Sequence, residues 1–592
     1  MHDMGHVDRS SPHGPCACVT WAPTAAAAAA TVESRADGAS TLAHTRECGA
    51  DCGVGKHSPI GSEIHSTQAA RYICVAHALK LVFLHSTHLV DGSDDRFRTM
   101  GKLTYDEVAK HSSADDCWII LYGKVYDLTE FIPEHPGGPQ IIVKNAGRDA
   151  TKLFDTVHPK GTIEKYLSAD KFKGEFDEST LPGEYKEQQK KEEAEEKERR
   201  ANLPPMSSCL NLHDLELVAS KVLSPEAWAY YSSAADDLET YHENKTVFRR
   251  IWFRPRILRN VRVVDPSTSI LGIPSKLPIY ITATALGRLG HPDGELNLTR
   301  AAAKTGLIQM VPTLSSCSFE DIVNARTEDG APTQFFQLYV NSDRRVVVDM
   351  LRRAEKANIQ AIFITVDAPQ LGRREKDMRM HFSDEGSNVQ GGEIQNRDEG
   401  AARAISSFID PALDWDGALW IKRNTRIPVL LKGVQTWEDA VMACEMGFAG
   451  VVLSNHGGRQ LDYARSGVEV LEEVVRELRK RNMFPSPAFQ ILVDGGFRRG
   501  TDILKAIAMG ATAVGVGRPF LYAYSAYGVD GVVHAINLLR AELEMNMRLI
   551  GANTIRDVVP EMVDLRALHT HNGLPTPGDG SSVLDVMDKS RL

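Results

Sequence analysis

Hydrophobic positions in the second half of the chain occur as short apolar runs, separated by stretches with helical spacing. This spacing is clear in "TWEDAVMACEMG" (436–447) and "GTDILKAIAMG" (500–510). Because apolar runs that alternate with helices are typical of buried parallel strands, the pattern predicts an α/β fold, a (β/α)8 TIM barrel over residues 206–570. A doubly wound open sheet is the alternative, but it would not need eight such units. The predicted strands are 277–283, 307–311, 334–340, 361–367, 428–433, 450–455, 490–496 and 513–517.

A second, smaller pattern covers residues 100–177 and predicts an α+β domain. Thr104 is placed to cap a short helix, and "CWIILYGKVYDLT" (117–129) predicts two short strands joined at Gly123. Residues 178–205 contain "EYKEQQKKEEAEEKERR", where acidic and basic residues alternate with almost nothing apolar. Such a stretch cannot build a core, so it predicts a solvated helix or hinge between two domains.

The two ends of the chain lack periodic patterning. Residues 1–99 hold an alanine run with scattered Ser, Gly and His, which predicts a disordered extension or an incorrectly assigned start of the gene, and residues 571–592 form a tail. Acidic residues in the extension argue against a transit peptide. The stretch 72–90 approaches the length of a membrane span, but Lys80 and three histidines within it argue against one.

Composition narrows the function classes. A formal net charge of -10 that is spread along the chain gives no electrostatic footprint for nucleic acid, so a small organic substrate is favoured. Hydrophobic residues make up 42% of the chain, which can fill at least one large core. Nine cysteines, an odd number, predict no disulfide framework, and a reducing compartment suits the core.

Chemically capable side chains follow the predicted strands, at the end of a barrel where active sites are built. His456 follows the sixth strand and is the predicted general base, because an unperturbed imidazole titrates near neutrality. Asp367, after the fourth strand, is expected to orient His456 and stabilise the imidazolium. One such residue alone is most often a turn former or a helix cap, whereas all eight strand ends together favour a site. The set is Thr284, Pro312, Tyr339, Asp367, Lys432, His456, Asp494 and Arg518.

Two arginines predict a carboxylic acid as substrate. Arg459 shares the loop of His456, and Arg374 follows the fourth strand. Two guanidinium groups can grip a carboxylate in forks that lysine cannot reproduce. Either arginine could instead form a surface ion pair, which is the alternative for both.

The last two predicted strands end in "VDGGFRRG" and "GVGRPF", at the habitual phosphate position of this barrel. Asp494 is expected to reach a ribityl-type hydroxyl. Lys432 offers a cation to a ring that becomes anionic on reduction, which suits a flavin better than a nicotinamide. The residues expected around the phosphate are Gly496, Arg498, Gly517 and Arg518.

Two histidines in the small domain predict a haem site. His135 stands in "EHPGG" and His158 in "DTVHPKG", each near a segment rich in Ile, Val, Leu and Phe. Two imidazoles on opposite walls of an apolar slot are what six-coordinate haem iron needs for electron transfer. Each histidine alone could be structural, and the spacing fits neither a zinc finger nor covalent haem attachment.

Longer motifs in both regions resemble known families. "FIPEHPGG" and "VHPKG" resemble the cytochrome b5 fold, whereas "SNHGGRQLD", "VDGGFRRG", "TVDAPQLGRREKDM" and "GVGRPFLYA" resemble the FMN-dependent 2-hydroxy-acid dehydrogenase family. The domain order, with its charged linker, is similar to that of the fungal flavocytochrome members. The resemblance covers roughly residues 101–570 and does not reach the first hundred.

The resemblance implies roles for individual residues. It implies His456 as the base with Asp367 as its partner, and Tyr339 beside the substrate hydroxyl. The implied carboxylate contacts are Arg374, Arg459 and Tyr230, and the implied haem ligands are His135 and His158. The implied FMN contacts are Ala283, Thr284, Gln337, Thr365, Lys432, Asp494, Gly496, Arg498, Gly517 and Arg518.

Three positions bear on the cofactor and the substrate. Where family members usually place a serine near the flavin, this chain has Pro312, which lacks a side-chain donor and an N–H. Ala285 and Leu314 resemble the lactate enzymes in leaving space for a methyl group. One methylene discriminates by only ~1–3 kcal/mol, so other short 2-hydroxy acids are expected to react as well.

The resemblance implies oxidation of L-lactate to pyruvate by FMN, with single electrons passing through a b-type haem to cytochrome c. It also implies a homotetramer in the mitochondrial intermembrane space, with the cytoplasm as the alternative location. The long polar stretch 373–403 predicts a mobile lid. Two other functions stay open: a 2-hydroxy-acid oxidase that passes electrons to oxygen, and a haem electron carrier fused to an inactive barrel.

Overall fold

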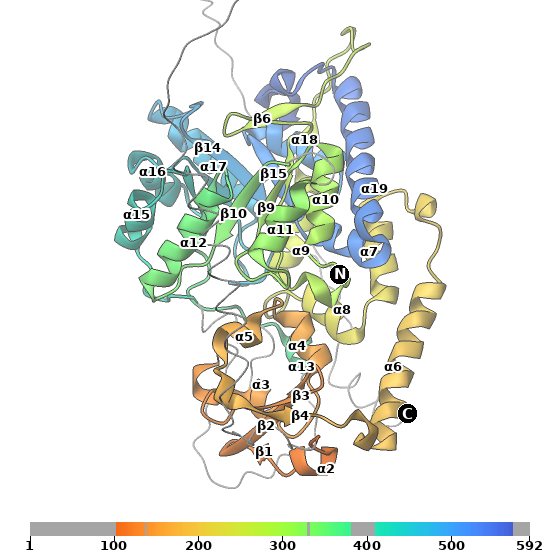
Figure 1. Ribbon diagram of the computed structural model, residues 1–592. Helices are drawn as coiled ribbons and strands as arrows, with labels where there is room; N and C mark the ends of the chain where they lie inside the picture. Colours follow the sequence, from red (N-terminus) through yellow and green to blue (C-terminus); the bar gives the residue numbers. More distant parts are fainter. Residues whose placement is uncertain (1–101, 136–138, 328–331, 381–408, 572–592) are drawn as a thin grey trace, which may run out of the picture. The chain divides into compact units, whose positions relative to one another are not determined.

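The computed structural model describes residues 102–135, 139–327, 332–380 and 409–571 (Figure 1). The predicted extension 1–99, most of the predicted lid 373–403 and nearly all of the tail 571–592 lie outside these residues. The chain is multidomain, with a small α+β domain followed by an eight-stranded barrel, as predicted.

The small domain is built on a four-stranded sheet in the order β1-β2-β3-β4. Thr104 is the N-cap residue of the first helix, as predicted, and its N–H donates to the Glu107 carboxylate at 2.7 Å. The predicted strand pair is β2–β3, and it turns at Tyr122 and Gly123, which both have positive φ. The elements are α2 (Tyr105–Val108), β1 (Ser112–Ser113), β2 (Asp116–Leu121), β3 (Lys124–Asp127), η2 (Ile132–Glu134), α3 (Pro139–Lys144), α4 (Thr151–Val157), α5 (Thr162–Tyr166), η3 (Ala169–Lys171), β4 (Phe172–Glu175) and η4 (Glu178–Thr180).

The charged linker forms helix α6 (Gly183–Ala201), in which no residue is buried. Ion pairs one turn apart, such as Arg200 with Glu196, support it. The prediction of a solvated helix is therefore confirmed.

The second domain is a closed barrel in which all eight predicted strands are present and parallel. Each strand pairs with the next along the chain, and the last closes against the first. They are β8 (Ile279–Ile281), β9 (Ile308–Val311), β10 (Gln334–Leu338), β11 (Ile362–Thr365), β12 (Val429–Val434), β13 (Gly450–Leu453), β14 (Gln490–Asp494) and β15 (Ala513–Val516).

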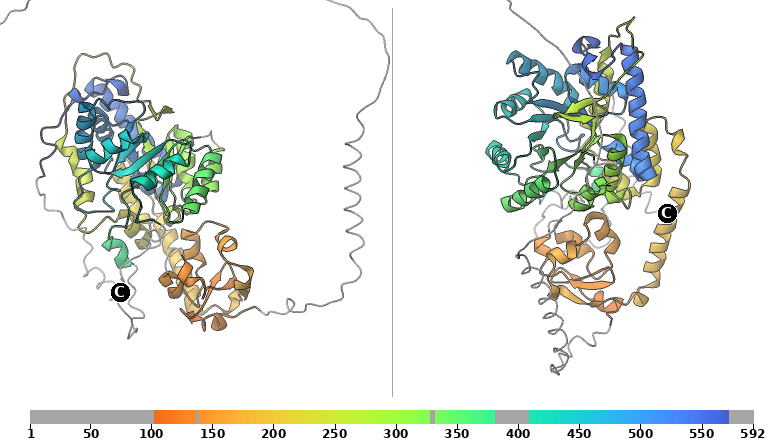
Figure 2. Two further views of the ribbon diagram at one scale, coloured as in Figure 1. Left: turned by 90° about the vertical axis from the view of Figure 1, so that its left-hand side faces the viewer. Right: turned by 45° about the horizontal axis from the view of Figure 1, so that its top comes forward.

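Alternation along these strands divides the core into two parts. Tyr280 of β8 points into the barrel, and each of the seven remaining strands also contributes a buried residue there. The neighbours of Tyr280 in the strand, Ile279 and Ile281, face the helices. The right-hand view of Figure 2 shows the strands at the centre and the helices outside them. The helices that follow the strands are α10 (Leu296–Thr305), α11 (Phe319–Asn324), α12 (Arg344–Lys356), α13 (Glu375–Met380), α15 (Trp415–Arg423), α16 (Trp437–Glu445), α17 (Gly467–Lys480), α18 (Gly500–Met509) and α19 (Arg518–Ile550).

Further elements lie outside the eight strand–helix units, and one of them closes the amino-terminal end of the barrel. The β6–β7 hairpin packs Ile270 under the barrel interior, and the N–H of Leu271 donates to Gln490 at the start of β14. The amino-terminal end is thereby closed, which leaves the carboxyl ends of the strands for the site. The added elements are α7 (Leu212–Val222), α8 (Pro225–Ser232), α9 (Glu239–Thr246), β5 (Trp252–Phe253), β6 (Thr268–Ile270), β7 (Ile273–Ser275) and β16 (Val563–Asp564).

Candidate functional site

A cavity opens at the carboxyl ends of the barrel strands. It has about 1170 Å³ of empty space when the open solvent at its mouth is included. Seven of the eight residues at the predicted strand ends line it. The eighth, Asp367, is 1% exposed at its side chain and lies behind His456.

His456 is held between two groups from other strands. Its Nδ1 lies 3.0 Å from Oδ1 of Asp367, and its Nε2 lies 3.3 Å from the hydroxyl of Tyr339. With Nδ1–H donating to the carboxylate, the lone pair of Nε2 is directed to the cavity side. The structure therefore brings together the predicted base, its partner and the hydroxyl group.

The surroundings set the charge of this pair. Burial lowers the pKa of His456 below its ordinary 6.5, and Lys432 acts in the same direction, against the opposing effect of Asp367. Burial alone would raise the pKa of Asp367, but the influence of His456 and Lys432 outweighs it and lowers that pKa. At neutral pH the pair is a neutral imidazole beside a carboxylate, which is the state that a general base needs.

Two tyrosines and two arginines surround the same part of the cavity. Burial, followed by the charge of Asp367, raises the pKa of Tyr339, so this phenol stays a hydrogen-bond donor. Arg459 donates from Nη1 to the carbonyl of Tyr230 at 2.8 Å and stacks 4.9 Å from the centre of that ring. Arg374 is 4% exposed, and its Nε has no hydrogen-bond partner among the described residues.

The two guanidinium groups are close enough to act on one another. Burial, followed by the charge of Arg374, lowers the pKa of Arg459 to about 10. Within the described part of the chain, neither arginine forms an ion pair with a carboxylate. A small anion bound between them would relieve this repulsion, which supports the predicted carboxylate site.

All ten predicted FMN contacts line the cavity. Lys432 lies at 3.4 Å from Oδ2 of Asp494 and at 3.4 Å from Oγ of Ser454. Burial would lower the pKa of Lys432, but Asp494 and Asp367 outweigh it and raise the pKa, so this buried side chain keeps its charge. A fixed cation is thereby present at the end of β12.

The end of β8 offers unsatisfied polar atoms. The hydroxyls of Thr282 and Thr284 are buried and have no hydrogen-bond partner among the described residues. Across the cavity, Gln337 donates to the hydroxyl of Thr365 at 2.9 Å. Buried groups without partners are costly, so these atoms fit a polar ligand such as FMN.

The residues predicted to contact the phosphate also make hydrogen bonds and packing contacts within the protein. Arg518 donates to the backbone carbonyls of Tyr231, Ser233 and Gly457, and Arg498 lies 3.4 Å from Oε2 of Glu216. A Cβ atom at Gly496 would lie 1.8 Å from the carbonyl oxygen of Asn244, so packing against α9 requires this glycine. Both arginines still line the cavity, but much of their hydrogen bonding holds the loops around it.

The small domain brings its two predicted haem ligands together. The rings of His135 and His158 lie 5.9 Å apart between centroids, with their planes tilted by 44°. Nδ1 of His158 lies 3.3 Å from the carbonyl of Phe154, which directs Nε2 away from the helix. Burial and the neighbouring His135 lower the pKa of His158 to about 4, so the imidazole is neutral, as a metal ligand must be.

Comparison with known families agrees with both sites. The model of the FMN-dependent dehydrogenase family matches residues 219–565, more than half of the chain. The chain belongs to this family. The model of the cytochrome b5-like heme/steroid binding domain matches residues 104–177. FMN and haem are therefore the cofactors of this family member, as predicted.

Individual relatives match most of this chain and most of their own length. "L-lactate dehydrogenase (cytochrome)" of Wickerhamomyces anomalus is 49% identical over 472 residues, which are 79% of this chain and 81% of the relative. The enzyme of that name from Saccharomyces cerevisiae is 46% identical over 486 residues, which are 80% of this chain and 82% of the relative. A solved structure of a flavocytochrome b2 double mutant with pyruvate bound is 45% identical, with a TM-score of 0.60, and the match covers 67% of this chain and 96% of that one.

Within the family pattern, Pro312 is the departure noted in the sequence. It lines the cavity after β9. The next residue compensates locally, because Thr313 donates from its N–H to Oε1 of Gln337 at 3.1 Å and from its hydroxyl to the carbonyl of Gln337 at 2.6 Å. The loop is therefore held by Thr313.

The two predicted specificity positions differ in exposure to the cavity. Ala285 lines it, whereas Leu314 packs in a small apolar cluster with Tyr339, Ala368 and Ile409. Leu371 of this cluster also reaches the cavity. Leu314 therefore packs with Tyr339 and Leu371, which do line the cavity.

Several residues that hold the site were not predicted. Gln460 donates to the carbonyls of Asp367 and Gln370 and accepts from the N–H of Gly372, so it ties the loop of His456 to the loop of Arg374. Asn244 and Asn455 exchange two side-chain hydrogen bonds of 2.9 Å. Gln460 directly follows Arg459 in the sequence, and this position could have identified it as part of the site. Nothing in the sequence linked Asn244 to Asn455.

No helix in the described part of the chain combines the length and the apolar character that a membrane crossing requires.

Proposed function

We propose that this enzyme oxidises L-lactate to pyruvate and passes the electrons singly through its haem to cytochrome c. The observation that carries the proposal is Nε2 of His456 on the cavity side, backed by Asp367 and accompanied by two buried arginines. The two relatives named L-lactate dehydrogenase (cytochrome) support the choice of substrate.

The substrate carboxylate is held by Arg374 and Arg459. The unpaired Nε of Arg374 and the excess positive charge of the two groups favour a small anion there. The hydroxyl of Tyr339, only 3.3 Å from Nε2 of His456, then lies beside the substrate hydroxyl. A substrate bound in this way presents its reacting carbon to the base.

His456 accepts a proton from the bound substrate. Its lowered pKa keeps Nε2 free before the reaction, and the carboxylate of Asp367 stabilises the imidazolium that forms. When bound, FMN supplies a two-electron acceptor and haem a one-electron carrier. Lys432 provides a buried positive charge at the flavin position, where reduction adds negative charge.

Absorption spectra of the purified protein test the proposal. After L-lactate is added in a stopped-flow instrument without oxygen, the flavin should be reduced first and the haem afterwards. Flavin reduction without haem reduction would favour the oxidase, and reduction of neither would favour the inactive barrel.

We also infer that the chain assembles into a homotetramer. Support comes from the loop between β5 and β6, where three apolar side chains stand exposed among arginines: Ile257 is 83% exposed, Leu258 is 100% exposed and Val263 is 73% exposed. Exposed apolar groups that lie close together in sequence are typical of a subunit interface. Light scattering of the wild type and of Leu258→Glu measures the mass, and the substitution should reduce it.

The mitochondrial intermembrane space is the proposed location, because cytochrome c is the proposed acceptor and is found there. Fractionation of the source cells, with an intermembrane marker and a cytoplasmic marker, tests it. Recovery with the cytoplasmic marker would contradict it.

A further inference from the structure

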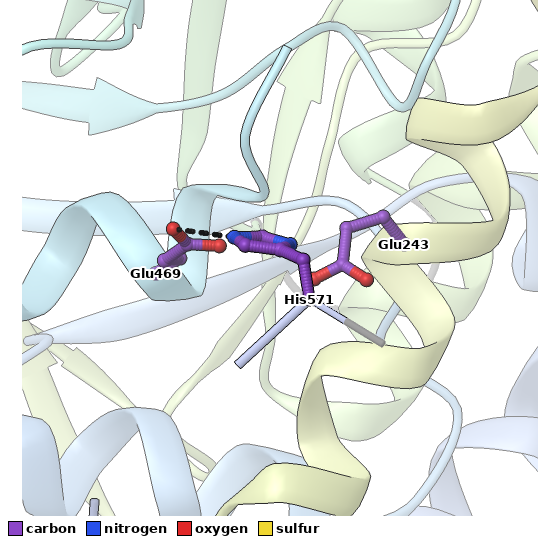
Figure 3. Close-up of side chains that lie close together, drawn as sticks. All are labelled: Glu243, Glu469 and His571. Atoms are coloured by element: carbon purple, nitrogen blue, oxygen red, sulfur yellow. Dashed lines mark hydrogen bonds and ion pairs between the residues drawn. The ribbon is translucent and has the colours of Figure 1, made fainter. Parts of the chain in front are cut away.

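Three potential metal ligands lie close together in the second domain (Figure 3). Glu243 comes from α9, Glu469 from the first turn of α17, and His571 from the segment after β16. One ligand atom of each lies within 4.8 Å of the others, and Nε2 of His571 lies 3.3 Å from Oε1 of Glu469. None of the three lines the cavity.

Glu469 is the unusual member of this group. It is 2% exposed, and its Oε2 has no hydrogen-bond partner among the described residues. The ion pair of that oxygen with Nη2 of Arg250 spans 3.8 Å, too long for a hydrogen bond. A buried carboxylate oxygen without a donor is costly, which indicates a ligand that the protein atoms do not supply.

The carboxylate of Glu243 is held in place by its neighbours. Nη1 of Arg250 donates to its Oε2 at 3.0 Å, Nη2 of Arg250 contacts its Oε1, and the hydroxyl of Thr246 donates to its Oε2 at 2.9 Å. Such outer hydrogen bonds are typical of carboxylates that bind metals. Arg250 neutralises one of the two carboxylates, so one negative charge remains for a cation.

A second histidine lies at the same place. Nδ1 of His569 is 3.5 Å from Oε1 of Glu469, and its Nε2 is 3.6 Å from Glu472. Both His569 and His571 are about half exposed, at 53% and 51%, so the site is open to solvent on their side. A fourth ligand is therefore available, either His569 or water.

We propose that Glu243, Glu469 and His571 bind one zinc-type divalent cation. Imidazole nitrogen combined with carboxylate oxygens in a set of three or four is a zinc set, whereas Mg²⁺ and Ca²⁺ prefer six or more oxygen ligands. The bound cation joins the C-terminal segment to α9 and α17. Because Asn244, next to Glu243, pairs with Asn455 next to His456, the cation reinforces the frame behind the base.

Zinc content of the full-length holoenzyme tests the proposal. Wild type, His571→Ala and Glu243→Gln are dialysed against the same low concentration of free Zn²⁺, and zinc per chain is measured by mass spectrometry. The N-terminal extension also contains His and Cys, so the difference between variants is the readout. We expect one equivalent less zinc in each variant, with flavin and haem spectra unchanged as proof of folding.

The matched control is His111→Ala. His111 pairs with Asp116 at 2.7 Å but belongs to no group of three potential ligands within the described residues, so zinc content should equal that of the wild type. Zn²⁺ should also raise the midpoint of thermal unfolding in the wild type and in His111→Ala, but not in His571→Ala. Equal zinc content in all four proteins, or displacement of the zinc by excess Mg²⁺, would overturn the proposal.

Discussion

The haem site and the flavin site are constructed in opposite ways. The haem site needs His135 and His158, both from one small domain, and an apolar surrounding. The flavin site collects side chains from the ends of all eight barrel strands and from α8, which precedes them. A two-ligand site depends on a few local contacts, whereas a site assembled from many loops depends on every contact that holds those loops.

The largest expected effect comes from replacing His456, the base at the flavin site. Replacing His456 with Gln keeps a polar side chain but removes the proton acceptor, so lactate-driven reduction of both cofactors should fall by about 10²- to 10⁴-fold. Turnover with cytochrome c measures the loss, and absorption spectra should show flavin and haem still bound. Near-normal turnover would refute the role of His456.

Replacing His158 with Ala should impair the haem site and leave the flavin site intact. One iron ligand is lost, so the haem spectrum should change and reduction of cytochrome c should collapse. Flavin reduction by lactate should stay at the wild-type rate, as followed by stopped-flow absorption. A slower flavin step would show that the two sites are not independent.

Replacing Arg374 with Lys keeps the charge but removes the fork and the unpaired Nε. Loss of a charged hydrogen bond of about 1.5–3 kcal/mol predicts a fall of about 10- to 100-fold in kcat/KM for lactate. Steady-state kinetics measure it. An Arg373→Lys variant is the control, since Arg373 is 57% exposed and should change little.

Replacing Leu314 with Ala should change selectivity more than rate. It makes space in the apolar cluster beside Tyr339, so longer 2-hydroxy acids should gain on lactate by ~1–3 kcal/mol, or about 5- to 150-fold in relative kcat/KM. The ratio of kcat/KM for 2-hydroxybutyrate and lactate measures this. An unchanged ratio would remove Leu314 from the substrate region.

The smallest effect is the response to pH. The base works only when unprotonated, and burial lowers the pKa of His456 below 6.5. Therefore kcat/KM should be flat from neutral pH upward to moderately basic pH, and it should fall as acid protonates Nε2. A pH profile of kcat/KM measures this; an acid limb centred above pH 6.5 would contradict it.

Features that depend on local sequence or on strand order could be predicted from the sequence. The eight strands were predicted because parallel strands buried on both faces are continuous apolar runs. The ends of those strands converge in any barrel, so seven of the eight residues chosen there line the cavity. The cap at Thr104 and the turn at Gly123 depend only on neighbouring residues, and both were predicted.

By itself, then, the sequence determined the barrel, the small domain, the solvated helix between them and which residues face the cofactor end, because these depend on local periodicity and on strand order. The tertiary structure alone decided that Gln460 ties the loop of His456 to Asp367, that Arg518 is occupied with backbone carbonyls, and that His571 reaches Glu469. Such contacts join segments far apart in the chain. Their geometry depends on how loops pack after folding, which no local pattern encodes.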